Sequence, residues 1–234
     1  MDTEDSMGSD QRIALVAGAS GMVGTALCSQ LRRDRRFAPV VVLARSQPPV
    51  TDPPLQVELV DFSRLGEWNP GVALDTVFCA LGTTINQAGS EAAFRAVDFD
   101  LVLEMARLAK RGNARHFVFV SSLGADPSSS IFYLRVKGEA EEAVKALDLP
   151  HAVALQPSFL DGERAVFRRG ERALRVVGRV LKPLLLGPLE KYRPTLATKV
   201  AEAMRQVAQP GREGFEVLDS VAISRWEERS RLLA

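Results

Sequence analysis

A tyrosine and a lysine are spaced for proton-transfer chemistry in the segment Tyr133-Leu-Arg-Val-Lys137. Residues four positions apart lie on one face of a helix, so the phenol and the ammonium would be neighbours. A phenol has an ordinary pKa of ~10, and a nearby ammonium lowers that pKa by favouring the phenolate. Tyr133 is therefore predicted to act as a general acid or base that Lys137 tunes.

Two adjacent serines precede this helix by about a dozen residues. Ser121 and Ser122 directly follow the apolar run 116–120, which is predicted to be a buried strand. Ligands of parallel sheets bind at the carboxyl ends of the strands, so a serine hydroxyl there can hold and orient the oxygen of a carbonyl or carbinol. Both serines are candidates for this role.

The elements that must position these groups begin with residues 12–24, which are predicted to form a strand, a glycine turn and the start of a helix. Gly18, Gly21 and Gly24 follow the pattern G-x-x-G-x-x-G. The first glycine permits the turn, the second lets a pyrophosphate approach, and the third lets the helix pack. The helix from about Met22 directs free N–H groups at those phosphates. The alternative is a strand–turn–helix corner that merely needs glycine.

The end of the second predicted strand, 39–45, favours NADP(H) over NAD(H). An acidic side chain at this position would bind the ribose 2′-hydroxyl of NAD, whereas the sequence reads Ala44-Arg45-Ser46. A guanidinium beside a hydroxyl suits a 2′-phosphate. The alternative is that Arg45 is an ordinary surface arginine.

Other strand ends complete the predicted cofactor site. Asp61 follows the strand 55–60 and either accepts a hydrogen bond from an adenine amino group or caps the next turn. Lys137 is expected to bind the cofactor ribose. The residues predicted to contact the cofactor are Gly18, Ser20, Gly21, Met22, Val23, Gly24, Arg45, Asp61, Phe62, Ala80, Leu81, Gly82, Tyr133, Lys137 and Pro157.

The alternation of strands and helices predicts an α/β fold, a single doubly wound Rossmann domain with about seven parallel strands and helices on both faces. The domain is expected to span 11–234, after a disordered tail at 1–10, with a substrate-pocket or lid segment at 158–213. Further strands are predicted at 76–81, 151–155 and 214–218, and helices at 91–110, from Tyr133 onward, and at 196–208.

Composition excludes several classes of protein. The 234 residues carry a formal net charge of +1, which gives no signature of nucleic-acid binding. The acidic start is not a secretory signal, and no apolar run is long enough to cross a membrane. Cys28 and Cys79 are expected to be packing residues, in agreement with a cytoplasmic protein. His116 and His151 are expected to be lone structural residues, without a metal or a catalytic triad.

Residues 164–182 contain many arginines interleaved with apolar side chains. This pattern is typical of a mobile lid over a substrate pocket, or of a surface extending to 186 that contacts a membrane or an acidic protein. Arg193, shortly before the last helix, is expected either to meet a substrate or cofactor group or to form a surface salt bridge.

Together these motifs resemble the short-chain dehydrogenase/reductase superfamily, in particular its atypical branch named for the Tat-interactive protein. The resemblance is carried by residues 18–24, 78–84, 97–100, 121–126 and 133–139. It implies a Rossmann fold, bound NADPH, the serine, tyrosine and lysine roles given above, and a possible homodimer. Ser121 fits the spacing of the branch, and Ser122 matches the second serine of the superfamily pair. Where many active members have an asparagine on the fourth helix, this chain has Asp98.

The sequence therefore predicts an NADPH-dependent oxidoreductase that acts on a small carbonyl or alcohol. The alternative is a non-catalytic NADPH-binding regulator or redox sensor that docks to a protein or membrane. A nucleotide-sugar epimerase fits less well, because 234 residues leave little room for a larger substrate lobe.

Overall fold

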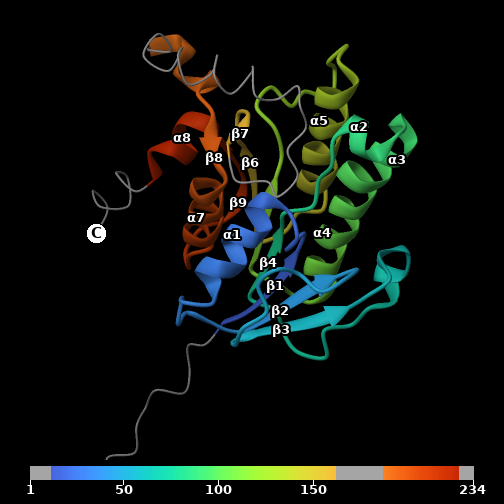
Figure 1. The fold of residues 1–234 in the computed structure, drawn as a ribbon, viewed down its shortest axis with the longest axis vertical. Coiled ribbons are helices and arrows are strands. Elements are labelled where there is room, and N and C mark those ends of the chain that lie inside the picture. The colour runs from blue at the N-terminus through green and yellow to red at the C-terminus, as the bar shows by residue number, and fades with distance from the viewer. Residues whose placement is uncertain (1–11, 162–186, 227–234) are drawn as a thin grey trace, which may run out of the picture.

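A computed structural model describes residues 12–161 and 187–226 (Figure 1). Seven parallel strands form one sheet in the order β3-β2-β1-β4-β5-β6-β9. The sequence order reverses beside β1, which leaves a crevice at the carboxyl ends of β1 and β4. The predicted doubly wound α/β fold is confirmed. The strands are β1 Arg12–Ala17, β2 Phe37–Ala44, β3 Leu55–Leu59, β4 Thr76–Cys79, β5 His116–Val120, β6 His151–Gln156 and β9 Gly214–Asp219.

Helices cover both faces of this sheet (Figure 1). On one face lie α1 Met22–Leu31, α7 Ala197–Val207 and α8 Ser220–Ser224, and on the other lie α4 Leu101–Arg111 and α5 Phe132–Lys145. Successive residues of β1 enter opposite cores, Ala14 and Val16 on the α1 side and Leu15 and Ala17 on the α4 side. A strand covered on both faces must be apolar throughout, as this one is.

The predicted helix 91–110 is wrong in one respect, because it is not a continuous α-helix. The structure divides it into α3 Glu91–Arg95, the π-helical turn η2 Ala96–Asp100 and α4. Asp98, within the π turn, is almost completely buried. Apolar periodicity predicts that a helix exists but carries no information about a local change in its hydrogen-bond spacing.

Several short elements were not predicted. They are the 3₁₀ helices η1 Phe62–Glu67 and η4 Gly187–Tyr192, the helix α2 Ile85–Ala88, and a small parallel pair of strands, β7 Leu160–Asp161 and β8 Thr195–Leu196. The Thr195 N–H donates to the Phe159 carbonyl at 2.9 Å. The β7–β8 pair thereby brings the chain that leads into α7 beside the carboxyl end of β6.

The predictions for residues 1–10, and for the basic segment within 164–186, lie outside the described residues. Within the described ranges, no helix is long and apolar enough to cross a membrane. Cys28 and Cys79 are buried and unbridged. Burial raises the pKa of the Cys28 thiol to about 11 and that of Cys79 to about 12, which disfavours the reactive thiolate.

Candidate functional site

Two glycines of the turn after β1, Gly18 and Gly24, are packed too closely for side chains. Gly18 has a φ of +91°, and a Cβ there would lie 2.5 Å from the Ala80 backbone. A Cβ on Gly24 would lie 2.1 Å from the Gly18 carbonyl oxygen. Gly21 is the N-cap of α1 and provides no side-chain hydrogen bond. The first N–H groups of α1 therefore face outward without a side-chain cap, as a phosphate requires.

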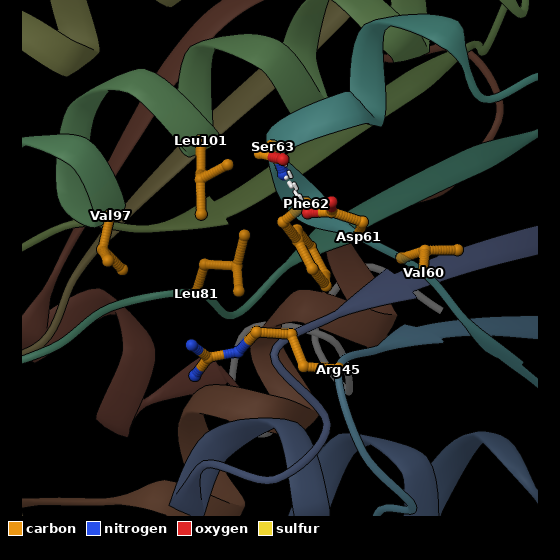
Figure 2. A pocket seen from close by; sticks show the side chains of 8 residues that line it. All are labelled: Arg45, Val60, Asp61, Phe62, Ser63, Leu81, Val97 and Leu101. Atoms are coloured by element: carbon orange, nitrogen blue, oxygen red, sulfur yellow. Dashed lines mark hydrogen bonds between the residues drawn. The ribbon is translucent and has the colours of Figure 1, made fainter.

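A cavity of about 460 Å³ lies at the ends of β2, β3 and β4 (Figure 2). It brings together four residues that the sequence predicted for the cofactor, namely Arg45, Asp61, Phe62 and Leu81. Its remaining walls are Val60, Ser63, Val97 and Leu101. In Figure 2 the Arg45 side chain extends along this largely apolar pocket from the end of β2. The cavity combines apolar walls with a cation, as an adenine and its ribose phosphate require.

Asp61 caps the turn that follows it. Its carboxylate accepts hydrogen bonds from the Ser63 hydroxyl at 2.7 Å and the Ser63 N–H at 2.9 Å (Figure 2). These bonds lower the pKa of Asp61 below its ordinary value, which favours the charged form. Of the two predicted roles, the turn-capping one is observed, and contact with adenine stays a prediction.

Lys137 projects from α5 into a buried ion pair with Asp98. Its Nζ lies 2.7 Å from Asp98 Oδ1, and both side chains are almost completely buried. Burial alone would lower the pKa of Lys137, but attraction to Asp98 and Tyr133 outweighs burial and raises it above its ordinary value. Asp98 Oδ2 accepts the Thr83 N–H at 2.9 Å. The Asp98 carboxylate thus ties Lys137 to the loop that follows β4.

Tyr133 lies half-buried one helical turn before Lys137. Its ring packs against the fully buried Phe94 of α3, with 5.5 Å between the ring centroids. The phenol and the ammonium therefore share one face of α5, as their spacing predicts.

The two serines after β5 have different surroundings. Ser121 is buried, and its hydroxyl donates to Glu141 Oε1 on α5. Gln156 Nε2 donates to the two Glu141 oxygens at 2.9 and 3.0 Å. Ser122 is only half-buried, and its hydroxyl lies 3.5 Å from the Leu123 carbonyl oxygen, a long and weak contact. The Ser121 hydroxyl therefore belongs to a buried hydrogen-bond network, whereas Ser122 lies partly exposed at the carboxyl end of β5.

Sequence reasoning missed Glu141, although a signal was present. Glu141 follows Lys137 by four residues, so it continues the helix face that Tyr133 and Lys137 define. Burial raises the pKa of Glu141, and the hydrogen bonds from Ser121 and Gln156 only partly oppose that effect. The site therefore contains a second buried carboxyl group besides Asp98.

Close backbone packing fixes the serine loop against α5. A Cβ on Gly138 would lie 2.3 Å from the backbone carbonyl carbon of Asp126 and the nitrogen of Pro127. The Asp126 N–H donates to the Leu134 carbonyl at 3.1 Å, and the Leu123 N–H donates to the Pro157 carbonyl at 3.0 Å. The loop that carries Ser122 thus lies between α5 and the end of β6.

The remaining predicted cofactor residues border the same crevice, at the ends of β1 and β4. Ser20 and Gly82 are exposed, and Met22 and Ala80 are partly exposed. Val23 of α1 and Pro157, which follows β6, are buried.

His116 and His151 begin their strands as predicted, but they are not lone residues. Their Nδ1 atoms lie 2.9 Å apart in a buried contact at the amino ends of β5 and β6, far along the sheet from the serines. Burial, with the charge of His151 second, lowers the pKa of His116 to about 4. Across the described ranges, no three His, Cys, Asp or Glu side chains are grouped to hold a metal.

Arg193 has no hydrogen-bond partner for its buried Nε atom, and no ion pair with it is found in the described part of the chain. The surface salt bridge that the sequence left open for Arg193 is therefore not observed among these residues.

This sheet, glycine turn and helix N-terminus define a NAD(P)-binding Rossmann domain. The family model described as NAD(P)H-binding matches residues 18–180. Protein HTATIP2 of Rattus norvegicus is 34% identical over 213 residues, which cover 89% of this chain and 86% of that protein. Protein FMP52-1 of Scheffersomyces stipitis is 32% identical over 222 residues, 92% of this chain and 95% of that protein. The chain belongs to this NAD(P)H-binding family, in the branch that contains HTATIP2 and FMP52.

Solved structures agree on the fold. A short chain dehydrogenase family protein from Francisella tularensis superposes with a TM-score of 0.63 at 12% identity, over 92% of this chain and 99% of that chain. At this level of identity the likeness concerns the fold alone.

The comparisons correct the expected cytoplasmic location. The fungal FMP52 relatives are named mitochondrial, which contradicts that expectation. Its basis was the small number of cysteines, and an unbridged cysteine pair does not distinguish the cytosol from another reducing compartment.

Proposed function

We propose that this protein is an NADPH-dependent oxidoreductase of the short-chain dehydrogenase/reductase type that acts on a carbonyl or alcohol. The observation that carries the proposal is the shared face of α5, on which Tyr133 and Lys137 lie beside the Ser122 edge of β5. An acid–base group, a buried cation and a hydroxyl that meet at the ligand-binding edge of a sheet suit this reaction class.

The described residues fit the dinucleotide. The glycine turn and the start of α1 suit the pyrophosphate, because the backbone leaves no room for side chains at Gly18 and Gly24 and the helix N-terminus has no side-chain cap. The cavity beside β3 suits the adenine, and Arg45 at that cavity suits a 2′-phosphate. When bound, the nicotinamide would supply or accept the hydride.

The chain itself would handle the proton. In reduction, the Ser122 hydroxyl donates to the carbonyl oxygen of the substrate and orients it, and the Tyr133 Oη–H proton passes to that oxygen as hydride reaches the carbon. The phenolate that remains is stabilised by the Lys137 ammonium, which the ion pair with Asp98 holds in place. Oxidation of an alcohol follows the same steps in reverse.

One observation favours a second candidate, an NADPH-binding regulator without turnover. Asp98 lies 2.7 Å from Lys137 Nζ and offsets the positive charge that would stabilise a phenolate. Under this alternative the chain binds the dinucleotide without reacting, and its affinity for a protein or membrane partner depends on whether the dinucleotide is bound. A homodimer is compatible with either function.

The deciding experiment compares Tyr133→Phe with Tyr192→Phe, the only other tyrosine of the chain. Calorimetry with NADPH and NADH comes first, followed by a carbonyl panel monitored by NADPH oxidation. Loss of a general acid lowers kcat by about 100-fold or more. We expect that loss for Tyr133→Phe with unchanged NADPH affinity, and wild-type turnover for Tyr192→Phe.

Either of two results would count against the proposal. Unchanged turnover in Tyr133→Phe would show that another group supplies the proton. Tight NADPH binding by the wild type without turnover of any panel member would favour the regulator.

A further inference from the structure

Arg193 is a partly buried arginine with one unpaired donor in the part of the chain that the structure describes. Its Nε atom is buried without a hydrogen-bond acceptor, and no carboxylate of the described residues pairs with the guanidinium. A buried polar group without a partner is unfavourable, so native proteins seldom retain one without a purpose. The Arg193 guanidinium is always charged, so its unpaired, buried Nε–H is costly.

Backbone contacts place Arg193 beside the candidate catalytic edge. The hydroxyl of Ser158 donates to the Arg193 carbonyl and lies 3.0 Å from the Thr195 hydroxyl. Ser158 follows Pro157, whose carbonyl accepts the N–H of Leu123, the residue after Ser122. Two hydrogen bonds therefore connect the Ser122 loop to the Arg193 backbone through residues 157 and 158, at the carboxyl ends of β5 and β6.

The charges at this edge differ in whether they are neutralised. Lys137 is paired with Asp98, and Glu141 is held by Ser121 and Gln156. Arg193 has no such counter-charge among the residues described. The Arg193 guanidinium therefore lacks a counter-charge within the described residues, and a guanidinium binds carboxylates and phosphates through two parallel N–H donors.

We propose that Arg193 binds an oxyanion of the substrate, a carboxylate or a phosphate, next to the reacting carbonyl. The preferred substrates are then anionic carbonyl compounds. This inference rests on the proposed function for the identity of the reacting group, but the anion site can be tested without turnover.

The test measures binding to the full chain loaded with NADP⁺, which carries no hydride and so cannot reduce the probes. The probes are phenylglyoxylate, its uncharged methyl ester and inorganic phosphate, each titrated by calorimetry. The variants are Arg193→Gln, Arg193→Lys and the control Arg107→Ala, an exposed α4 arginine whose ion-pair partner is Glu104. A melting curve for each variant verifies that it folds.

We expect the wild type to bind phenylglyoxylate more tightly than the ester. Arg193→Gln should weaken phenylglyoxylate binding by about 10- to 100-fold, as for a lost charge-assisted hydrogen bond. The phenylglyoxylate affinity of Arg193→Lys should lie between those of the wild type and Arg193→Gln, because lysine keeps the charge but loses the paired donors. Ester binding and the Arg107→Ala control should not change. Arg193-dependent binding of phosphate instead of phenylglyoxylate would identify a phosphorylated carbonyl compound as the substrate class.

Three results would overturn the inference. The first is that the wild type binds the acid and the ester with equal affinity and does not bind phosphate. The second is unchanged anion affinity in Arg193→Gln. The third is weakened NADPH affinity in that variant, which would assign Arg193 to the cofactor. NADPH oxidation with phenylglyoxylate is measured separately. Anion binding that depends on Arg193 but leads to no turnover would uphold the anion site and count against the proposed oxidoreductase.

Discussion

At the scale of single residues, Asp98 connects two parts of the candidate site. Its carboxylate is buried against Lys137 Nζ at 2.7 Å and also accepts the Thr83 N–H. A buried ammonium without a counter-charge would lose its proton or destabilise the fold, because the interior disfavours an isolated charge. Asp98 thus keeps Lys137 charged. Its negative charge also cancels part of the positive potential by which Lys137 would stabilise the Tyr133 phenolate.

Replacing Asp98 by asparagine should therefore destabilise the protein. Asp98→Asn keeps the shape of the side chain but leaves the Lys137 ammonium buried without its counter-ion, so the free energy of unfolding at pH 7 should fall by about 3 kcal/mol. Asp100→Asn, two residues along the same segment and exposed, should change it by less than about 0.5 kcal/mol. Urea titration measures both. Equal stability of the two variants would mean that the ion pair contributes little.

Whole elements were predictable where apolar patterns are long. Strand β5 has the predicted bounds 116–120, and β1 begins the predicted strand–turn–helix unit 12–24, because a strand covered on both faces is apolar throughout. The π turn around Asp98 and the β7–β8 pair were not predictable, since short elements depend on tertiary contacts and not on local periodicity.

The candidate site shows the same division. Tyr133 and Lys137 were predictable from helical spacing, and the glycine turn from its motif. Glu141 was overlooked although its spacing from Lys137 was a signal, whereas its partnership with Gln156 at the end of β6 could not be predicted from local spacing, because 15 residues separate the two. The different surroundings of Ser121 and Ser122 likewise depend on which side of the sheet each residue faces.

The contact between β5 and β6 should make stability depend on pH. His116 in the folded chain has a pKa of about 4, below the ordinary 6.5, because burial favours the neutral ring. The unfolded chain therefore takes up the proton first as pH falls. The stabilisation is complete above pH 6.5 and declines toward pH 4, by roughly 3 kcal/mol in all. The charged groups nearby are Asp75, Arg12 and Arg115 around His116, and Glu216 and Arg212 around His151.

Urea unfolding between pH 7 and pH 4 measures this dependence. His116→Gln keeps a polar side chain at the contact but cannot titrate, so its stability should fall less steeply with pH than that of the wild type. The double variant with His151→Gln removes both histidines of the chain. Its free energy of unfolding should depend on pH still less steeply, with carboxylates as the remaining titrating groups. Parallel curves for all three proteins would mean that the histidine pair is not perturbed.

For the molecule as a whole, the cofactor crevice joins the two halves of the sheet. The glycine turn follows β1, and the cavity lies at the ends of β2, β3 and β4. The Asp98 carboxylate links Lys137 of α5 to the loop after β4. A dinucleotide bound across this edge would contact both halves at once. Because an unfolded chain has none of these contacts, binding should stabilise the entire fold.

The melting temperature should therefore rise with NADPH, and the rise should depend on Arg45. At about 100 times its Kd, a ligand specific for the folded state adds about 2.7 kcal/mol, which corresponds to roughly 5 to 10 °C for a chain of this size. If Arg45 binds the 2′-phosphate, NADH at the same concentration should raise the melting temperature less. Arg45→Ala should abolish that difference, whereas the exposed Arg64→Ala, paired with Glu67, should preserve it. Equal shifts by both nucleotides in the wild type would exclude selectivity through Arg45, and no shift by either would mean that the crevice does not bind a dinucleotide.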